Sequence, residues 1–378
     1  MREGKLPMFP YNLKFRLEDL GEDSLFEIEV GFDDQILIYG FSIDIIGRVV
    51  KREYLYANIS GSEKLIFDIQ NQKIAILSSA ASIKERVDIY FNDLNKDEFL
   101  LIKLAESSEI FWFSKFIYKW LLDDLVIITP KTTISNKINQ FIKTKEREAE
   151  DSIIDILKTF DTGITDYVYQ KMNLEKFLEI LNDKKIKDGE GYARFYQDLM
   201  DFDEKKVIET NIGGDFYRIS YPKGKKEPIV ELLGFRHCGN DEKYFSYDEE
   251  SDGTKRLVEI VNILYSVQAV GKTFIIDEIE RSFHSNLTLE FIKKFLNYAS
   301  KNKGQLIITT HETKIMNFNL VRQDELWIID RNKKGMSNLV PLSGFNIRAD
   351  KILDKDYLAG RYGGVPNILT ILESDLNE

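Results

Sequence analysis

The sequence predicts an α/β protein: a mixed or parallel sheet flanked by helices, an antiparallel β subdomain and a helical insertion. Three observations predict this class. Apolar and polar residues alternate in short runs over residues 11–75, helical spacing prevails from about 80 to 205, and strands alternate with helices after 206. Strands that alternate with helices of about 10–15 residues are typical of βαβ units and a parallel sheet.

The composition is that of a globular chain with room for two or three domains of about 100–200 residues each. Of 378 residues, 43% are hydrophobic and 30% charged, and the formal net charge of −11 argues against a strongly basic surface. The single cysteine, Cys238, excludes an internal disulfide and fits a reducing compartment. No apolar run reaches the roughly 20 residues of a membrane span, and the N-terminus lacks the apolar region of a signal peptide. We therefore expect a cytoplasmic protein without a membrane partner.

The first part of the chain, residues 1–100, is expected to be the antiparallel β subdomain. Alternating runs with short turns between them predict antiparallel strands with one solvated face. The expected strands are Leu25–Val30, Gln35–Phe41, Glu53–Ala57 and Lys64–Ile69.

The next part, residues 101–205, is expected to be a helical arm or insertion, because its apolar residues recur at helical spacing. Residues 131–150 are rich in Lys and Glu around a thin apolar stripe, which predicts a solvated helix. Its basic residues alternate with glutamates, so a solvated face is favoured over a nucleic-acid contact. The basic residues are Lys143, Lys145 and Arg147.

The third part, residues 206–345, is expected to begin with strands and to continue with alternating strands and helices. The expected strands are Lys206–Thr210, Asp215–Ser220, Ile229–Phe235, Thr273–Ile276, Gln305–Thr309 and Glu325–Ile329, and the expected helices are Lys255–Val267 and Asn286–Ala299.

Two carboxylates, Asp277 and Glu278, follow the apolar strand Thr273–Ile276 directly. A buried parallel strand delivers such residues to its C-terminal edge, where open α/β sheets bind ligands. In a nucleotide hydrolase the first carboxylate would hold Mg²⁺ through water and the second would polarise the attacking water. The alternative is a buried strand whose acidic end simply meets solvent.

Two further motifs flank this pair. Ser251, Gly253 and Thr254 stand at the start of an amphipathic helix, whose N-terminus attracts anions. The alternative is that Ser251 or Asp252 serves only as a helix cap. His311 follows the apolar strand Gln305–Thr309 and would reach the same ligand, or lie exposed in solvent.

The order Ser-x-Gly-Thr, Ile-Ile-Asp-Glu and Thr-Thr-His resembles the signature loop, Walker B strand and switch histidine of the ABC-type ATPases. Three segments are more specifically similar to the bacterial AAA15 ATPases, a group related to the OLD and retron-associated ATPases. The resemblance implies an ABC-ATPase-like head, with residues 346–378 as a family-specific C-terminal segment. The similar segments are Glu250–Arg256, Asp277–His284 and Tyr357–Pro366.

The resemblance also implies roles for single residues, with ATP and Mg²⁺ as cofactors. Asp277 would hold the metal-bound water, Glu278 would act as general base, and His311 would contact the γ-phosphate. The signature residues Ser251, Gly253 and Thr254 would reach a nucleotide in the opposite subunit, so the protein would form a homodimer through this loop. An effector protein, and more weakly a nucleic acid, are the other partners that it implies, in a phage-defence or nucleic-acid-associated system.

The phosphate-binding motif of the family, Gly-x-x-x-x-Gly-Lys-Ser/Thr, does not occur in the sequence. Gly271-Lys272-Thr273 comes nearest, but Ser266 replaces the first glycine and the triplet enters a strand instead of opening a helix. We expect the chain alone to be inactive. Three explanations stay open: a truncated product, which we favour, a cradle on a separate polypeptide, or a degenerate ATPase. The alternative function is a non-catalytic interaction module.

Overall fold

A computed structural model describes the chain in two compact units. One unit contains residues 1–125 with 329–339, and the other contains residues 126–328 with 340–378. The described residues are 5–7, 23–59, 61–70, 73–76, 81–107, 111–130, 154–182, 207–223, 227–238, 242–266, 271–348 and 353–365. No helix among them has the length and apolar character that a membrane-spanning helix needs.

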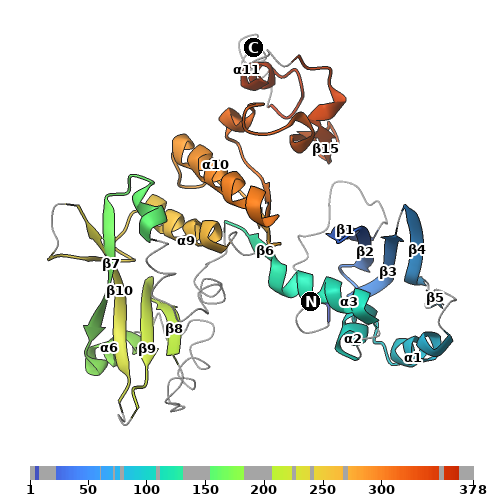
Figure 1. The fold of residues 1–378 in the computed structure, drawn as a ribbon, viewed down its shortest axis with the longest axis horizontal. Coiled ribbons are helices and arrows are strands. Elements are labelled where there is room, and N and C mark those ends of the chain that lie inside the picture. Colours follow the sequence, from blue (N-terminus) through green and yellow to red (C-terminus); the bar gives the residue numbers. More distant parts are fainter. Residues whose placement is uncertain are drawn as a thin grey trace, which may run out of the picture. The chain divides into compact units, whose positions relative to one another are not determined.

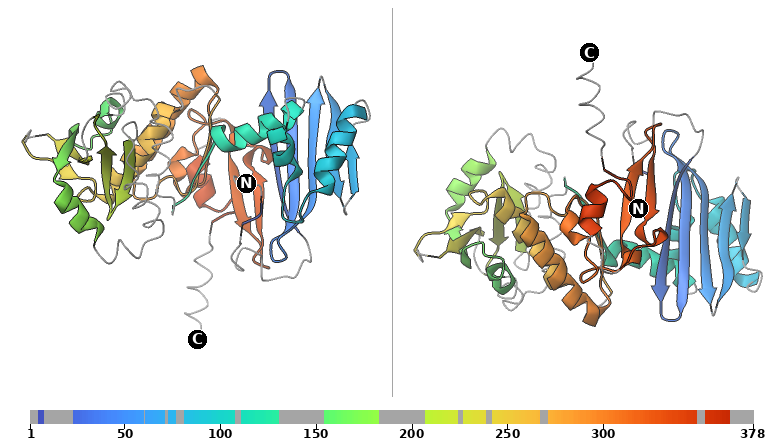
Figure 2. Two further views of the ribbon diagram at one scale, coloured as in Figure 1. Left: turned by 90° about the horizontal axis from the view of Figure 1, so that it is seen from below. Right: turned by 90° about the horizontal axis from the view of Figure 1, so that it is seen from above.

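The first unit is built on an antiparallel five-stranded meander with the order β1-β2-β3-β4-β5 (Figure 1). Helices α2 and α3 lie against one face of it (Figure 2), and the strand prediction for this region is confirmed. The elements are β1 (Ser24–Phe32), β2 (Gln35–Asp44), β3 (Val49–Ile59), β4 (Ser62–Gln70), β5 (Lys73–Ile76), α1 (Ala81–Asn92), α2 (Leu100–Ser107) and α3 (Trp112–Lys119).

Alternation along these strands sends one set of side chains into the core. Leu37, Leu55 and Phe67 are fully or almost fully buried and belong to one cluster with Leu100 and Leu101 at the start of α2. The residues that alternate with them along the strands face the opposite side of the sheet, where Arg52 forms a bidentate ion pair with Asp68. The sheet therefore has one apolar and one polar face, as alternating strands predict.

The second unit contains a three-stranded sheet with the order β13-β12-β6, in which β12 and β13 run parallel. Helices α9 and α10 pack on one face through an apolar cluster that includes Phe274, Ile276, Leu257 and Phe291. The elements are β6 (Leu125–Ile128), α9 (Asp252–Ser266), β12 (Thr273–Ile276), α10 (Ser285–Asn302) and β13 (Gln305–Ile308).

A second sheet in this unit has the order β11-β10-β9-β8, with β7 also paired to β10. Helix α6 packs on it through Phe177 and Leu181, which contact a cluster containing Tyr217, Ile219 and Val230. The elements are β7 (Ile164–Met172), α6 (Leu174–Leu181), β8 (Val207–Ile212), β9 (Asp215–Ser220), β10 (Ile229–His237) and β11 (Phe245–Ser246).

The prediction of helical structure from about 80 to 205 is wrong at two places, β6 and β7. β6 is a four-residue apolar run, too short for periodicity to separate strand from helix. β7 is rich in β-branched and aromatic residues, and its partner β10 lies far away in the sequence. The predicted solvated helix at 131–150 falls outside the described residues.

The strand pair β14 (Trp327–Arg331) and β15 (Ser337–Pro341) lies mostly in the residues 329–339 of the first unit. The short helix α11 (Leu353–Leu358) belongs to the second unit, where Ile328, Leu342, Leu353 and Tyr362 form a buried cluster. The α/β class with a parallel pair of strands, flanking helices and an antiparallel subdomain is thus confirmed.

Candidate functional site

The parallel strands β12 and β13 end side by side, and the residues that follow them form the centre of the candidate site. Ile276 is paired with Ile308, so Asp277 and Thr309 occupy equivalent positions one residue beyond the ladder. The Asp277 backbone N–H donates to the carbonyl of Ile128, which holds it against β6 as well. Both neighbouring strands therefore fix Asp277 at the sheet edge.

The Thr309 hydroxyl connects the two carboxylate residues. Its Oγ1 donates to Asp277 Oδ1 at 2.5 Å and accepts the Glu278 backbone N–H at 2.8 Å. One side chain, directly after β13, thus contacts both acidic residues that follow β12. Neither the spacing nor the composition of the acidic motif points to Thr309. Aligning the ends of the two parallel strands, however, places Thr309 beside Asp277.

Glu278 is exposed and adopts a left-handed backbone conformation, with φ of 49°. Non-glycine residues in this region carry strain, which folded structures keep most often at functional positions. Ser282, four residues later, also has a positive φ, of 66°. The loop from Asp277 to His284 is therefore a tightly bent connection between β12 and α10.

His311 is exposed two residues beyond Thr309, and its backbone is attached to the same loop. Its N–H donates to Glu280 Oε1 at 2.7 Å. Glu312, the next residue, accepts the N–H of Lys314. Burial opposes the shift, but hydrogen bonds from Ser285 and from this N–H lower the pKa of Glu312 below its usual value. A carboxylate thus stays charged beside His311.

Ser251 caps helix α9. Its Oγ accepts the Thr254 N–H at 3.1 Å and lies 2.9 Å from the Thr254 hydroxyl. The capping role left open by the sequence is therefore present in this structure. A cap of this kind leaves other N–H groups of the first turn available to an anion.

Gly253 lies against the loop that follows β12. A Cβ atom at this position would be 2.9 Å from the backbone carbonyl oxygen of Ser282. Only glycine allows the helix start and the loop to approach so closely without a shift of one of them. The signature-like residues and the acidic pair are thus linked within one subunit through this contact.

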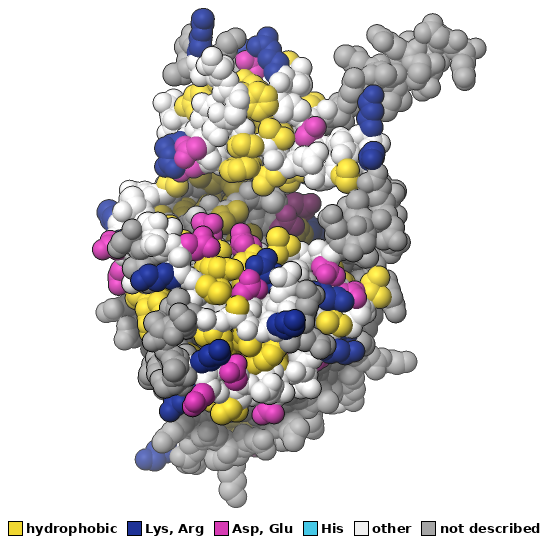
Figure 3. All heavy atoms as spheres, turned by 90° about the vertical axis from the view of Figure 1, so that its right-hand side faces the viewer, with side chains coloured by type: hydrophobic (Ala, Val, Ile, Leu, Met, Phe, Trp, Pro, Cys, Tyr) yellow, Lys and Arg dark blue, Asp and Glu magenta, His cyan; other side chains and the backbone are white. Residues whose placement is uncertain are grey.

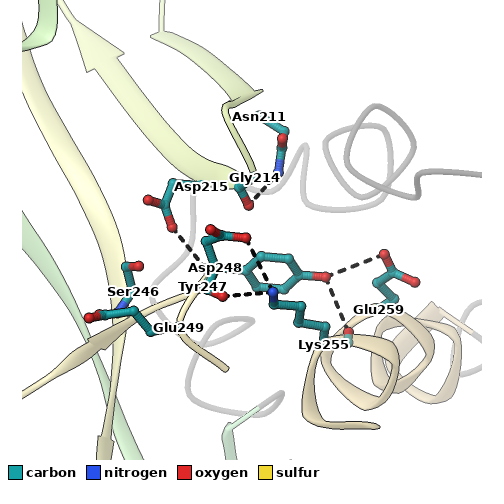
Figure 4. Close-up of polar contacts among 9 residues, drawn as sticks. All are labelled: Asn211, Gly214, Asp215, Ser246, Tyr247, Asp248, Glu249, Lys255 and Glu259. Carbon is teal, nitrogen blue, oxygen red and sulfur yellow. Dashed lines mark hydrogen bonds and ion pairs between the residues drawn. The ribbon is translucent and has the colours of Figure 1, made fainter. Parts of the chain in front are cut away.

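The turn that precedes Ser251 is fixed by the second sheet and by α9 (Figure 4). The Asp248 N–H donates to Asp215 Oδ1 at 2.9 Å, and Lys255 Nζ donates to the Asp248 carbonyl at 2.7 Å. The Tyr247 hydroxyl lies 3.3 Å from Glu259 Oε1. Burial and the nearby Glu259 charge raise the pKa of Tyr247 well above its usual range, so its hydroxyl stays protonated as a donor.

Glu250, immediately before Ser251, is buried and paired with His237 at the end of β10. Glu250 Oε1 lies 2.7 Å from His237 Nε2. The start of α9 is therefore attached to the antiparallel sheet on one side and to the post-β12 loop on the other. No spacing in the sequence predicts this pair, because only the fold brings its two members together.

The site residues fit a magnesium ion that is shared with a bound phosphate. Within the described ranges, no three His, Cys, Asp or Glu side chains gather closely enough to form a metal site by themselves. Mg²⁺ usually takes only one or two protein carboxylates and completes its shell with water and substrate phosphates. Asp277 is the carboxylate that would hold it, and the ion would supply charge neutralisation.

Gly271-Lys272-Thr273 lies at the wrong end of β12 for phosphate binding. Gly271 has φ of 81° in a turn whose N–H donates to Asn302 at the end of α10. Thr273 begins β12, whereas Asp277 follows its other end. The rejection of this triplet as the phosphate cradle is supported by its position.

Comparison with known proteins gives a family match over most of the chain. A family model described as "AAA domain, putative AbiEii toxin, Type IV TA system" matches residues 10–317. No match was found among curated proteins.

Two solved structures show limited similarity to the chain. One is an Smc head bound to the C-terminal winged-helix domain of ScpA, with 11% identity, 81% of this chain and 74% of that chain covered, and a TM-score of 0.27. The other is an Smc head domain with an extended coiled coil bound to the C-terminal domain of ScpA, derived from Pyrococcus furiosus. It has 13% identity, 81% and 77% coverage, and a TM-score of 0.25. These scores are too low to support an argument.

Proposed function

The chain belongs to this family of AAA domains, and we propose that it binds and hydrolyses ATP at the ends of β12 and β13. The observation that carries the proposal is the hydrogen-bonded edge that joins Asp277, Glu278, Thr309 and His311. Nucleotide binding at the C-terminal edge of parallel strands is the general rule for open α/β sheets.

Within this proposal each residue has a distinct task. Asp277, held by the Thr309 hydroxyl, would hold Mg²⁺ through water. Glu278, exposed beside it, accepts the proton of the attacking water. His311 contacts the γ-phosphate, and Ser251, Gly253 and Thr254 at the start of α9 contact the nucleotide of a second subunit.

The proposal requires a phosphate cradle that the 378 residues do not contain as a sequence motif. β13 is at the end of its sheet in the described part of the chain, and Ile307 on it is 48% exposed. An open parallel strand with an exposed apolar side chain is unusual, because parallel sheets are normally covered on both faces. These features favour completion of the sheet by a strand, glycine-rich loop and helix supplied from elsewhere.

We further propose a homodimer that closes through the start of α9, acting with an effector protein in a phage-defence system related to the AAA15 and OLD ATPases. The single cysteine agrees with a cytoplasmic location. Nucleic acid is the weaker candidate partner. On the face drawn in Figure 3 the described Lys and Arg side chains are interspersed with Asp and Glu, without a basic stripe.

The test is ATP hydrolysis by the protein completed with a phosphate loop. The nucleotide sequence upstream of Met1 is read, and a segment with the phosphate-loop motif found there is fused to residues 1–378. Hydrolysis is expected, and Glu278→Gln is expected to lower kcat by about 100-fold or more, because a general base is worth that factor. Equal rates for both proteins would contradict the assignment of Glu278.

The non-catalytic interaction module is the second candidate. Ser251 and Thr254 satisfy each other's hydrogen bonds as a cap, an arrangement that needs no nucleotide. If no phosphate loop is encoded upstream and the chain still associates with a partner protein without ATP, this second function is favoured.

A further inference from the structure

Glu280 is the one acidic residue of the post-β12 loop that the proposed chemistry does not use, yet its side chain accepts a hydrogen bond from the segment that follows β13. We propose that Glu280 is the positioning residue for His311 and fixes the histidine backbone relative to Glu278. The role assigned to His311 rests on the proposed function, whereas the contact itself does not.

The contact is short and links two separate segments. The His311 N–H donates to Glu280 Oε1 at 2.7 Å, across 31 positions of sequence. Hydrogen bonds to a charged acceptor are shorter and about twice as strong as those between neutral groups. The bond therefore provides a firm attachment for a residue that is otherwise exposed beyond the end of β13.

Its location determines what the attachment does. Glu280 stands two residues after Glu278, and Ile279 between them is fully buried, with its N–H donated to the Thr309 carbonyl. The segment from Glu278 to Glu280 thus makes three hydrogen bonds with the residues that follow β13, through Thr309 Oγ1, the Thr309 carbonyl and the His311 N–H. Glu278 and His311 consequently share one rigid frame.

The second carboxylate oxygen of Glu280 indicates that a contribution to stability does not by itself explain a glutamate at this position. Oε2 is buried and has no hydrogen-bond partner among the residues that the structure describes. An unsatisfied buried carboxylate oxygen is costly, and an apolar side chain would avoid this cost. The hydrogen bond that the Glu280 carboxylate does make is the one with the His311 N–H, which supports a positioning role.

The three histidines of the chain make the test selective. Labelling with ¹⁵N-histidine gives backbone amide signals only from His237, His284 and His311. His311→Gln removes one signal and so assigns it. Hydrogen exchange of each amide is then measured in the chain without nucleotide. The exchange rates therefore test the Glu280–His311 contact independently of whether the completed protein hydrolyses ATP.

Glu280→Ala is expected to speed exchange of the His311 amide by about tenfold or more and to leave His237 and His284 within about twofold. Glu280→Gln keeps an acceptor oxygen and is expected to restore most of the protection. Glu278→Ala, which removes the same charge two residues away, is the matched control and should leave His311 exchange unchanged.

Three outcomes would overturn the proposal. They are an unchanged His311 amide in Glu280→Ala, an equal rise in the alanine and glutamine variants, and an equal change of all three histidine amides. If the alanine variant fails to fold, Glu280→Gln decides alone: retained protection of His311 supports the proposal, and full loss contradicts it.

Discussion

Two glutamates hold neighbouring segments together in the two units, and they do so in different ways. Glu53 in β3 is completely buried, and its oxygens accept the Tyr39 hydroxyl and the N–H groups of Leu100 and Leu101 at the start of α2. Glu280 in the loop after β12 accepts the His311 N–H, and within the described ranges its other oxygen has no hydrogen-bond partner.

The difference separates a structural carboxylate from one that serves a site. Every contact of Glu53 satisfies a buried group or caps a helix, so the first unit depends on it. Glu280 organises exposed residues at an open strand edge, and much of its hydrogen-bonding capacity is unused. We infer that the first unit is built for stability at this point, while the second keeps a strained, polar loop for function.

The largest expected effect is that of Glu53→Ala on stability. The change leaves two buried N–H groups and a buried hydroxyl without their acceptor, so the free energy of unfolding should fall by roughly 3 kcal/mol or more. Glu280→Ala should lower it by less than about 1 kcal/mol, because it removes one bond to an exposed segment. Urea unfolding followed by tryptophan fluorescence measures both, and similar losses would break the comparison.

The next effect is the pH dependence that Glu53 imposes. Burial raises the pKa of Glu53 from 4.5 to about 7, against the opposing hydrogen bonds from Leu101, Leu100 and Tyr39. The folded state therefore binds a proton that the unfolded state has released, and the free energy of unfolding falls by up to about 3 kcal/mol as pH rises from about 4.5 to about 7.

Glu53→Gln cannot titrate and should abolish that slope. Unfolding of the wild-type and glutamine proteins at about pH 5 and about pH 8 gives the difference, since all other groups are common to both. A wild-type slope that survives in the glutamine variant would show that another group causes it.

Gly253→Ala tests the contact between α9 and the loop after β12. The added methyl group would lie 2.9 Å from the Ser282 carbonyl oxygen, so helix or loop must shift at a cost of about 1–3 kcal/mol. Gly344→Ala is the control, because no atom lies within 4 Å of its added Cβ. Equal unfolding midpoints for the two variants would refute the close approach.

The smallest expected effect on stability is that of Thr309→Val. It removes the hydroxyl that joins Asp277 to the Glu278 N–H, at an exposed strand end, and should cost about 1 kcal/mol or less. Thr309→Ser keeps the hydroxyl and should match the wild type. A valine variant as stable as the serine variant, with unchanged ATP hydrolysis in the completed protein, would remove Thr309 from the site.

The sequence predicted the strand β12 and the helix α10 well, because an apolar run ending in carboxylates and a strong helical periodicity are local signals. It also placed Asp277 at a strand end correctly. The strands β6 and β7 were missed, since their partners β12 and β10 are remote in sequence and only pairing identifies them.

The sequence singled out the acidic residues Asp277 and Glu278 but not the residues that contact them or the segments beside them. Thr309, Glu280 and His237 act through contacts between segments, namely a parallel register, a loop approach and the packing of β10 beside α9. No spacing within one segment encodes such contacts. The close approach at Gly253 was likewise invisible until the loop containing Ser282 was located.

The most direct test of the account is calorimetric titration of Mg-ATP into two proteins. Residues 1–378 alone are expected to show no saturable binding, because the proposed metal carboxylate and base are not accompanied by a phosphate-binding sequence motif. The Glu278→Gln protein completed with a phosphate loop is expected to bind without turning the nucleotide over. Micromolar binding by residues 1–378 alone, or no binding by the completed protein, would contradict the account.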